Sequence, residues 1–284
     1  MGAGTRHAVA VVMAVLLTSC AASADDGVTS TTPERATEPA TPTTYTYGES
    51  AEQFAVLTVP STAGPHPVVV LIHGGFWRAA YGLDLMDPLA ADLVRRGYAA
   101  WNVEYRRVGQ PGGGWPGTLE DVAAAVDQLA EVAAVADLDL TRVSVVGHSA
   151  GGHLALWAAG RETLERGVPG ADPAVTVAAA VGLAPVTNLR MGAEGGLGGG
   201  AVVDFLGGLP EEFPDRYAVA EPNLTADAAY AIIEGDADDI VPERFARPDR
   251  PGDVTFVLIP GADHFDVIDP AHAAWAAAVA ELAS

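Results

Sequence analysis

Short apolar runs alternate with amphipathic segments along most of this 284-residue chain. The runs are rich in β-branched residues, and most are apolar at every position, which is typical of strands buried on both faces of a parallel sheet. The pattern predicts strands at Tyr45–Tyr47, Phe54–Val59, Pro67–Ile72, Tyr98–Tyr105, Val143–Val146, Val175–Leu183, Ala229–Glu234 and Val254–Ile259. The first two flank a Gly-Glu-Ser segment and are expected to pair antiparallel.

Helical spacing of apolar residues fills the intervals between these strands. In Leu85–Arg96 leucines recur every four residues, and Gly97 follows as a terminator. The next expected helix, 118–136, opens with Thr-Leu-Glu-Asp, which we interpret as a capping box. Further helices are expected at Leu154–Ala159 and Ala271–Ala283. Strands alternating with helices over one continuous stretch predict an α/β fold with a mostly parallel central sheet covered on both faces.

One long segment, residues 187–228, breaks this alternation. It contains the glycine-rich run 195–200 and three prolines, at Pro210, Pro214 and Pro222. Loops of this length are usually functional, so we expect a partly irregular insertion near the active site, analogous to a lid. A plain surface loop is the alternative.

The N-terminal segment has the pattern of an export signal. Residues 1–19 combine a short basic start with the apolar run Ala8–Leu17, which is too short to span a bilayer. The sequence Leu-Thr-Ser-Cys that ends at Cys20 resembles the lipobox of bacterial lipoproteins, which implies a signal peptide over 1–19 and lipidation of Cys20. Cleavage after Ala24 and free secretion are the alternative. We expect an exported protein, held at the extracytoplasmic side of the cell membrane by its lipid or otherwise secreted.

Residues 20–44 are expected to form a disordered tether, because they are rich in threonine, proline, alanine and glutamate and have almost no large apolar residue. Residues 45–284 then form the folded domain. Any contact with the membrane is expected only through the N-terminal lipid.

Composition narrows the chemistry. All 15 basic residues are arginine, and the absence of lysine excludes a P-loop lysine and a lysine Schiff base. A formal net charge of −22 argues against nucleic acid as a partner. Cys20 is the only cysteine, so no intramolecular disulfide forms. The acidic run near Asp236 lacks the spacing of a calcium loop.

The strand at Val143–Val146 leads into Gly-His-Ser-Ala-Gly, a match to G-x-S-x-G, and a helix follows. This is the strand–turn–helix context of a nucleophile elbow. Gly147 and Gly151 permit the sharp turn that exposes the hydroxyl of Ser149. Ser149 is therefore the predicted nucleophile, and the amide of Ala150 faces the position where negative charge develops.

A serine nucleophile needs a base and an acid that orients the base. His264 follows the last strand and is the predicted base, whereas His272 is expected inside the final helix at the surface. Three aspartates follow the penultimate strand. We choose Asp238, which begins Asp-x-x-Val-Pro, over Asp236, which is too close to the strand, and Asp239, which points outward. The resulting order, serine, aspartate, histidine, is that of α/β hydrolases.

The sequence His-Gly-Gly-Phe-Trp, at 73–77, follows the strand Pro67–Ile72. Lipases and esterases carry similar glycine-rich sequences here, so Gly74 or Gly75 is expected to supply the second oxyanion-hole amide. The expected role of His73 is structural, a hydrogen bond that ties the loop. Aromatic residues of this loop and the next are candidates for lining the substrate pocket: Phe76, Trp77 and Trp115.

These motifs together resemble the bacterial α/β-hydrolase-fold esterases close to kynurenine formamidase, and the broader carboxylesterase and prolyl-oligopeptidase-like families. The resemblance covers residues 54–284 and implies a single-domain hydrolase without a metal or an organic cofactor, which attacks esters, aryl formamides or occasionally peptides. It departs from cytoplasmic formamidases in the lipobox. We expect an esterase acting on small, neutral carboxylic esters through an acyl-serine, with an aryl formamidase or, less favoured, a peptidase as alternatives. A non-catalytic surface lipoprotein that binds a partner is the alternative of a different class, and the oligomeric state is open.

Overall fold

The computed structural model describes residues 41–248 and 253–283. The predicted signal peptide, Cys20 and residues 20–40 of the predicted tether lie outside these residues. The boundary predicted at residue 45 is wrong, because Thr43 and Thr44 lie in a strand and pair with Leu57 and Val56. Within the described ranges, no helix is both long and apolar enough to cross a membrane.

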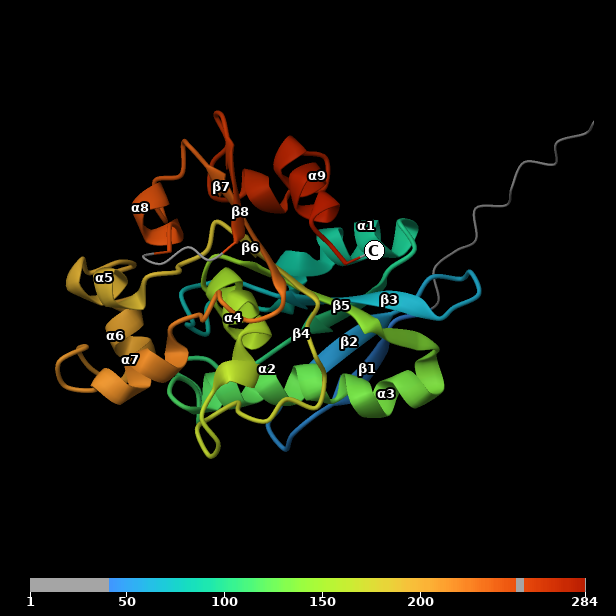
Figure 1. The fold of residues 1–284 in the computed structure, drawn as a ribbon, viewed down its shortest axis with the longest axis horizontal. Helices are drawn as coiled ribbons and strands as arrows, with labels where there is room; N and C mark the ends of the chain where they lie inside the picture. The colour runs from blue at the N-terminus through green and yellow to red at the C-terminus, as the bar shows by residue number, and fades with distance from the viewer. Residues whose placement is uncertain (1–40, 249–252, 284) are drawn as a thin grey trace, which may run out of the picture. The chain divides into compact units, whose positions relative to one another are not determined.

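The described chain folds around one eight-stranded sheet in the order β1-β2-β4-β3-β5-β6-β7-β8 (Figure 1). From β4 to β8 all neighbouring strands are parallel, and β2 pairs antiparallel with both β1 and β4. The strands are β1 (Thr43–Thr46), β2 (Phe54–Thr58), β3 (His66–Ile72), β4 (Ala99–Val103), β5 (Leu138–His148), β6 (Ala179–Leu183), β7 (Ala229–Gly235) and β8 (Val254–Ile259). The mostly parallel sheet expected from the apolar runs is confirmed, and β6 begins four residues later than predicted.

Helices cover both faces of this sheet. The described helices are α1 (Asp87–Arg95), α2 (Gly117–Asp127), α3 (Leu129–Ala136), α4 (Ala150–Ala159), α5 (Leu189–Glu194), α6 (Ala201–Leu206), α7 (Pro214–Ala220), α8 (Glu243–Ala246) and α9 (Ala273–Ala280), with short 3₁₀ turns η1 (Leu83–Met86), η2 (Arg161–Thr163) and η3 (Asp266–Ile268). α2, α3 and α4 pack on one face, and α1 and α9 on the other.

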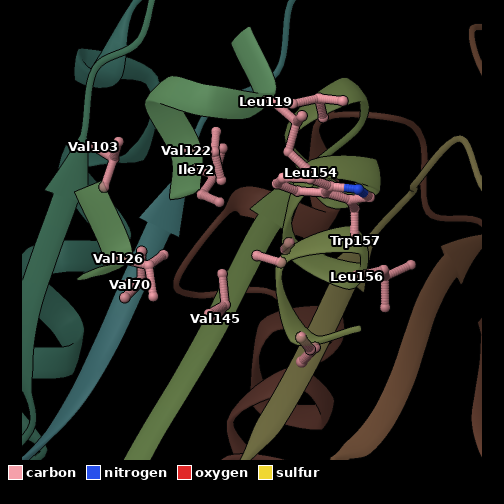
Figure 2. Packing of buried hydrophobic residues seen from close by; sticks show 14 of the residues in the cluster. Val70, Ile72, Val103, Leu119, Val122, Val126, Val145, Leu154, Leu156 and Trp157 are labelled. Carbon is pink, nitrogen blue, oxygen red and sulfur yellow. The ribbon is translucent and has the colours of Figure 1, made fainter. Parts of the chain in front are cut away.

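Alternation along β3 shows how the sequence builds this core. Val70 and Ile72 point to the face covered by α2 and α4, whereas Val69 and Leu71 point to the face covered by α1 and α9. Figure 2 shows Val70 and Ile72 among side chains of α2 and α4, including Leu154. A strand buried on both faces needs apolar residues at every position, which is the pattern of the sequence.

The capping box predicted at Thr118 is wrong. The helix starts at Gly117 without a side-chain cap, and the Thr118 hydroxyl instead donates to the carbonyl of Arg106. Asp121 is held by the guanidinium of Arg106 through contacts of 2.6 and 2.8 Å. The helix also breaks at Gln128, which separates α2 from α3. Thr118 and Asp121 therefore bind Arg106 and do not cap the helix.

The last helix is shorter than predicted, and His272 precedes it. Its ring nitrogen Nδ1 accepts the amide of Ala274 and so caps α9, instead of lying inside the helix. The insertion 187–228 is more ordered than expected, since it contains α5, α6 and α7. Its movement as a lid stays a prediction.

Candidate active site

Ser149 lies in the turn between β5 and α4, as the elbow motif predicts. Its backbone has φ 56° and ψ −120°, a conformation that costs energy for any residue with a Cβ. The flanking glycines are sterically required. A Cβ on Gly147 would lie 2.0 Å from the carbonyl oxygen of Gly151, and a Cβ on Gly151 would lie 2.2 Å from that of Ile72. The turn is therefore accessible only to this pattern of small residues.

Asp238 and His264 form a buried pair. The Nδ1–H of His264 donates to Oδ2 of Asp238 at 2.6 Å, and the side chains are 4% and 0% exposed. The other oxygen, Oδ1, accepts the amides of Ile240 and Val241, each at 2.8 Å. The Asp-x-x-Val-Pro sequence thus folds back on its own carboxylate. Burial alone would raise the pKa of Asp238, but the hydrogen bond and charge of His264, with the two amides, hold the pKa below its ordinary value.

The neighbouring aspartates have other partners. Asp236 accepts the amide of Gly261 at 2.6 Å, and Asp239 is exposed. His272 caps α9 and does not approach this pair. The structure therefore brings together His264 and the one aspartate of the three that was predicted.

His148, which precedes the elbow serine, supports the loop that carries His264. Its Nε2–H donates to the backbone carbonyl of His264 at 2.9 Å, and the two rings lie 4.6 Å apart. Burial, helped by the charge of His264, lowers the pKa of His148 to about 3, so this ring is neutral. A neutral ring with Nε2 protonated is the form that this hydrogen bond requires.

Ser149 and His264 line one small cavity of about 90 Å³. No hydrogen bond joins their side chains in the described part of the chain. The cavity is lined by Gly75, Phe76, Tyr81, Leu85, His148, Ser149, Ile240, His264 and Phe265. Apolar side chains therefore surround the serine and the imidazole.

The loop at Gly74 and Gly75 closes one side of this cavity. Gly75 has φ 109° and lines the cavity, whereas a Cβ on Gly74 would lie 3.1 Å from Cβ of Ser149. Ala150 is the first residue of α4, where amides have no acceptor within the helix. The three residues predicted to supply an oxyanion hole are thus gathered next to Ser149.

His73 ties this loop to the sheet, as predicted. Its Nδ1–H donates to the carbonyl of Gly74 at 2.8 Å, and Nε2 lies 3.0 Å from Oε1 of Glu104. Arg107 bonds the same carboxylate oxygen at 2.9 Å, and the hydroxyl of Tyr105 donates to the carbonyl of His73. The loop is therefore held by a buried polar network.

Of the three aromatic residues predicted to line the pocket, only Phe76 does so. Trp77 is fully buried and stacks on Phe205 at 4.8 Å, so the prediction for it is wrong. Trp115 is also outside the cavity lining and packs against the hydrophobic core. Phe76 and Trp77 both have left-handed backbone angles, with φ 54° and 55°. Two successive residues with left-handed angles direct their side chains differently from residues in an ordinary loop. The sequence does not show that these two residues adopt such angles.

Several lining residues were missed from the sequence. Phe265 follows the predicted base directly, and Ile240 lies inside the Asp-x-x-Val-Pro element, so position along the chain was a usable signal for both. Tyr81 and Leu85 carry no such signal, because they reach the cavity from the loop and turn that precede α1.

A parallel sheet with a serine elbow after β5 and a carboxylate–imidazole pair after β7 and β8 defines a hydrolase of the α/β-hydrolase fold. Residues 56–247 match the family model described as BD-FAE, and the chain belongs to this family of α/β-hydrolase esterases. The fold and the esterase family expected from the sequence motifs are confirmed.

Similar proteins agree with this assignment. The chain is 39% identical over 89 residues to carboxylesterase NlhH of Mycobacterium tuberculosis, a match that covers 31% of this chain and 27% of that protein. The match therefore spans little more than a quarter of the length of the curated relative.

Solved structures of esterases share the fold. A bifunctional GH43-CE protein of Bacteroides eggerthii has a TM-score of 0.71 at 21% identity, covering 84% of this chain and 34% of that one. Esterase B of Lactobacillus rhamnosis, inhibited by a C4-C4 tributyrin phosphonate, has a TM-score of 0.65 at 21% identity, with coverage of 84% and 80%. Est2 of Thermogutta terrifontis has a TM-score of 0.59 at 21% identity, with coverage of 78% and 82%. At these identities the likeness shows the fold.

Proposed function

We propose that this protein is a serine esterase that cleaves small carboxylic esters through an acyl-serine intermediate. Ser149 is the nucleophile, His264 the general base and Asp238 the acid that orients it. The observation that carries this proposal is the 2.6 Å bond between His264 and Asp238, with His264 and Ser149 facing one cavity.

The geometry suggests how each group acts. Asp238 holds Nδ1–H of His264, which leaves Nε2 with a lone pair for the proton of Ser149. The serine Oγ attacks the acyl carbonyl, and the amides of Ala150 and of Gly74 or Gly75 stabilise the oxyanion. Protonated His264 then donates its proton to the leaving alcohol. Water, deprotonated by the same imidazole, hydrolyses the acyl-serine and restores the enzyme.

The cavity favours short, neutral acyl groups. Its volume of about 90 Å³ lies well below the roughly 300–1,000 Å³ of pockets that enclose drug-sized ligands. One structural relative supports the same size range, since structures of Est2 of Thermogutta terrifontis hold propionate in one case and butyrate in another. Aryl formamides rank second, because the oxyanion hole does not distinguish between leaving groups. A peptide needs an open groove, which this cavity does not offer.

The cellular setting is also part of the proposal. We propose export of the chain and lipidation at Cys20, with the residues between Cys20 and β1 as the tether between the membrane and the folded domain, which begins at Thr43. The support is the lipobox-like sequence and its single cysteine. Incorporation of labelled palmitate that Cys20→Ala abolishes would support lipidation, whereas a soluble, unlabelled wild-type protein in the culture medium would overturn it.

Labelling by a fluorophosphonate tests the nucleophile. Ser149→Ala should abolish labelling and lower kcat by about 10⁴-fold or more, as loss of a triad member does. Ser61→Ala, at an exposed serine outside the site, is the matched control and should behave as wild type. A Ser149→Ala protein that retains normal turnover would exclude this mechanism, and a wild type that is neither labelled nor active would favour a binding lipoprotein.

A substrate panel tests the specificity. We expect kcat/KM to fall from acetyl and butyryl to dodecanoyl p-nitrophenyl esters, and to be lower still for an aminoacyl anilide. Highest efficiency on the dodecanoyl ester or the anilide would contradict the proposal. Highest efficiency on N-formyl-kynurenine would instead identify an aryl formamidase.

A further inference from the structure

Glu234 is a buried acidic residue that the proposed mechanism does not use. It lies next to the end of β7, four residues before Asp238, on the sheet face to which Ile232 also points. Its side chain is 0% exposed, and neither carboxyl oxygen has a hydrogen-bond partner of ordinary geometry among the described residues, although the backbone amide of Gly235 acts to lower its pKa. An ionised carboxylate without donors is among the most costly groups to bury, so this position requires an explanation.

The charges around Glu234 make ionisation harder still. Asp238 and Glu243 of α8 face it, and both are acidic. The basic residue of α8, Arg244, lies over the ring of Phe245 at 4.4 Å. The strands β6 and β8 and the helix α9 contribute no titratable side chain, and Asp266 of η3 accepts the amide of Asp263. No described cation pairs with Glu234.

Protonation of Glu234 removes the cost of burying a charged carboxylate here. Burial, reinforced by Asp238, raises the pKa of Glu234 to about 9. Two neighbouring carboxyl groups form a hydrogen bond only when one of them is protonated, and the protonated one then donates. Oδ1 of Asp238 already accepts two amides, while Oδ2 accepts only His264. One acceptor position on Oδ2 is therefore available to a neutral Glu234.

We propose that Glu234 is a positioning residue, a carboxylic acid that keeps its proton at neutral pH and donates a hydrogen bond to Asp238. This inference rests on the proposed function, because it assigns a role toward the pair of Asp238 and His264. A neutral donor on Oδ2 holds the Asp238 carboxylate in place together with the two amides that bind Oδ1. It also withdraws part of the negative charge that would otherwise stabilise protonated His264. Asp238 consequently attracts the protonated imidazole less strongly than a carboxylate without this donor would.

The pH dependence of kcat/KM separates this role from a purely structural one. Glu234→Leu removes the donor, so the acidic limb of the profile should move up by about half a pH unit or more, with kcat at the alkaline plateau less affected. Glu234→Gln supplies an amide donor of nearly the same shape and should keep the wild-type limb. Ser149→Ala, measured in parallel, establishes that the activity is the proposed one.

Infrared spectroscopy supplies a readout that does not require turnover. The wild type at pH 7 should show the C=O stretch of a protonated, buried carboxyl group, and Glu234→Gln should lack it. Absence of that band from the wild type, or a Glu234→Leu profile that superimposes on the wild type, would overturn the inference while leaving the esterase proposal intact. Activity that survives Ser149→Ala would overturn the proposed function, and the band would still report the protonation of Glu234.

Discussion

Replacing Glu234 by glutamine should stabilise the protein, and the gain should grow with pH. In the unfolded chain a glutamate ionises near its ordinary pKa of 4.5, whereas burial raises the pKa in the folded protein to about 9. Between these values the folded protein retains a proton that the unfolded chain has released. The free energy of unfolding therefore falls as pH rises through this window, by up to about 1.36 kcal/mol per pH unit.

The size of this destabilisation follows from the number of pH units by which the solution pH exceeds the pKa of the unfolded chain. At pH 7, about 2.5 units above 4.5, the proton retained by Glu234 costs the wild type about 3 kcal/mol. Glutamine does not titrate and occupies nearly the same volume, so Glu234→Gln should avoid this cost. The difference between the two proteins should be near zero at pH 4.5, rise steadily and become constant above pH 9. Other titrating groups, including Asp238, are present in both proteins and cancel in the comparison.

Urea unfolding at pH 5, 6, 7, 8 and 9 measures this difference directly, provided that the slope with urea is the same for both proteins. Glu211→Gln, at an exposed glutamate, reports the general effect of removing one negative charge from a chain of net charge −22. A Glu234→Gln protein whose stability relative to the wild type does not change with pH, or falls as pH rises, would refute the protonated state of Glu234.

Two further pairs of variants test the site. Asp238→Asn should lower kcat by about 10⁴-fold, because the orientation of His264 is lost, whereas Asp239→Asn should leave kcat near the wild-type value; equal losses in steady-state assays would show that the aspartate was wrongly chosen. Gly74→Ala places a Cβ 2.8 Å from the carbonyl oxygen of His148, so the loop must shift, and the displaced amides should lower kcat by about 10²-fold or more. Gly199→Ala, with φ 64° and open space around the added Cβ, should cost about 1 kcal/mol in thermal unfolding and leave kcat unchanged; the reverse order of effects on kcat would contradict the placement of the oxyanion hole.

Much of the fold was predictable because parallel strands buried on both faces must be apolar throughout. The parallel order of the strands also indicated where the candidate site lies. Ser149, Asp238 and His264 each follow a strand of one parallel sheet, and the carboxyl ends of such strands meet at one edge. Chain order and local motifs were therefore sufficient to place all three candidate residues at this edge before their contacts were known.

What the sequence did not reveal depends on contacts between distant residues or on backbone direction. The polar groups at the start of α2 bind Arg106 instead of capping the helix, and nothing local to Thr118 indicates this. Trp77 turns into the core because the loop passes through left-handed angles. The support of His264 by His148 joins residues 116 positions apart. Each of these features becomes visible only when the chain is folded.

The conformation of Ser149 has a consequence for attempts to improve this protein by directed evolution. Its φ of 56° with ψ of −120° suits glycine, so Ser149→Gly would relieve about 1–3 kcal/mol of backbone strain. A library screened only for heat resistance would therefore enrich a variant that folds better than its parent but lacks the proposed nucleophile. A screen for thermal stability of this protein should therefore also select for catalytic turnover at every round.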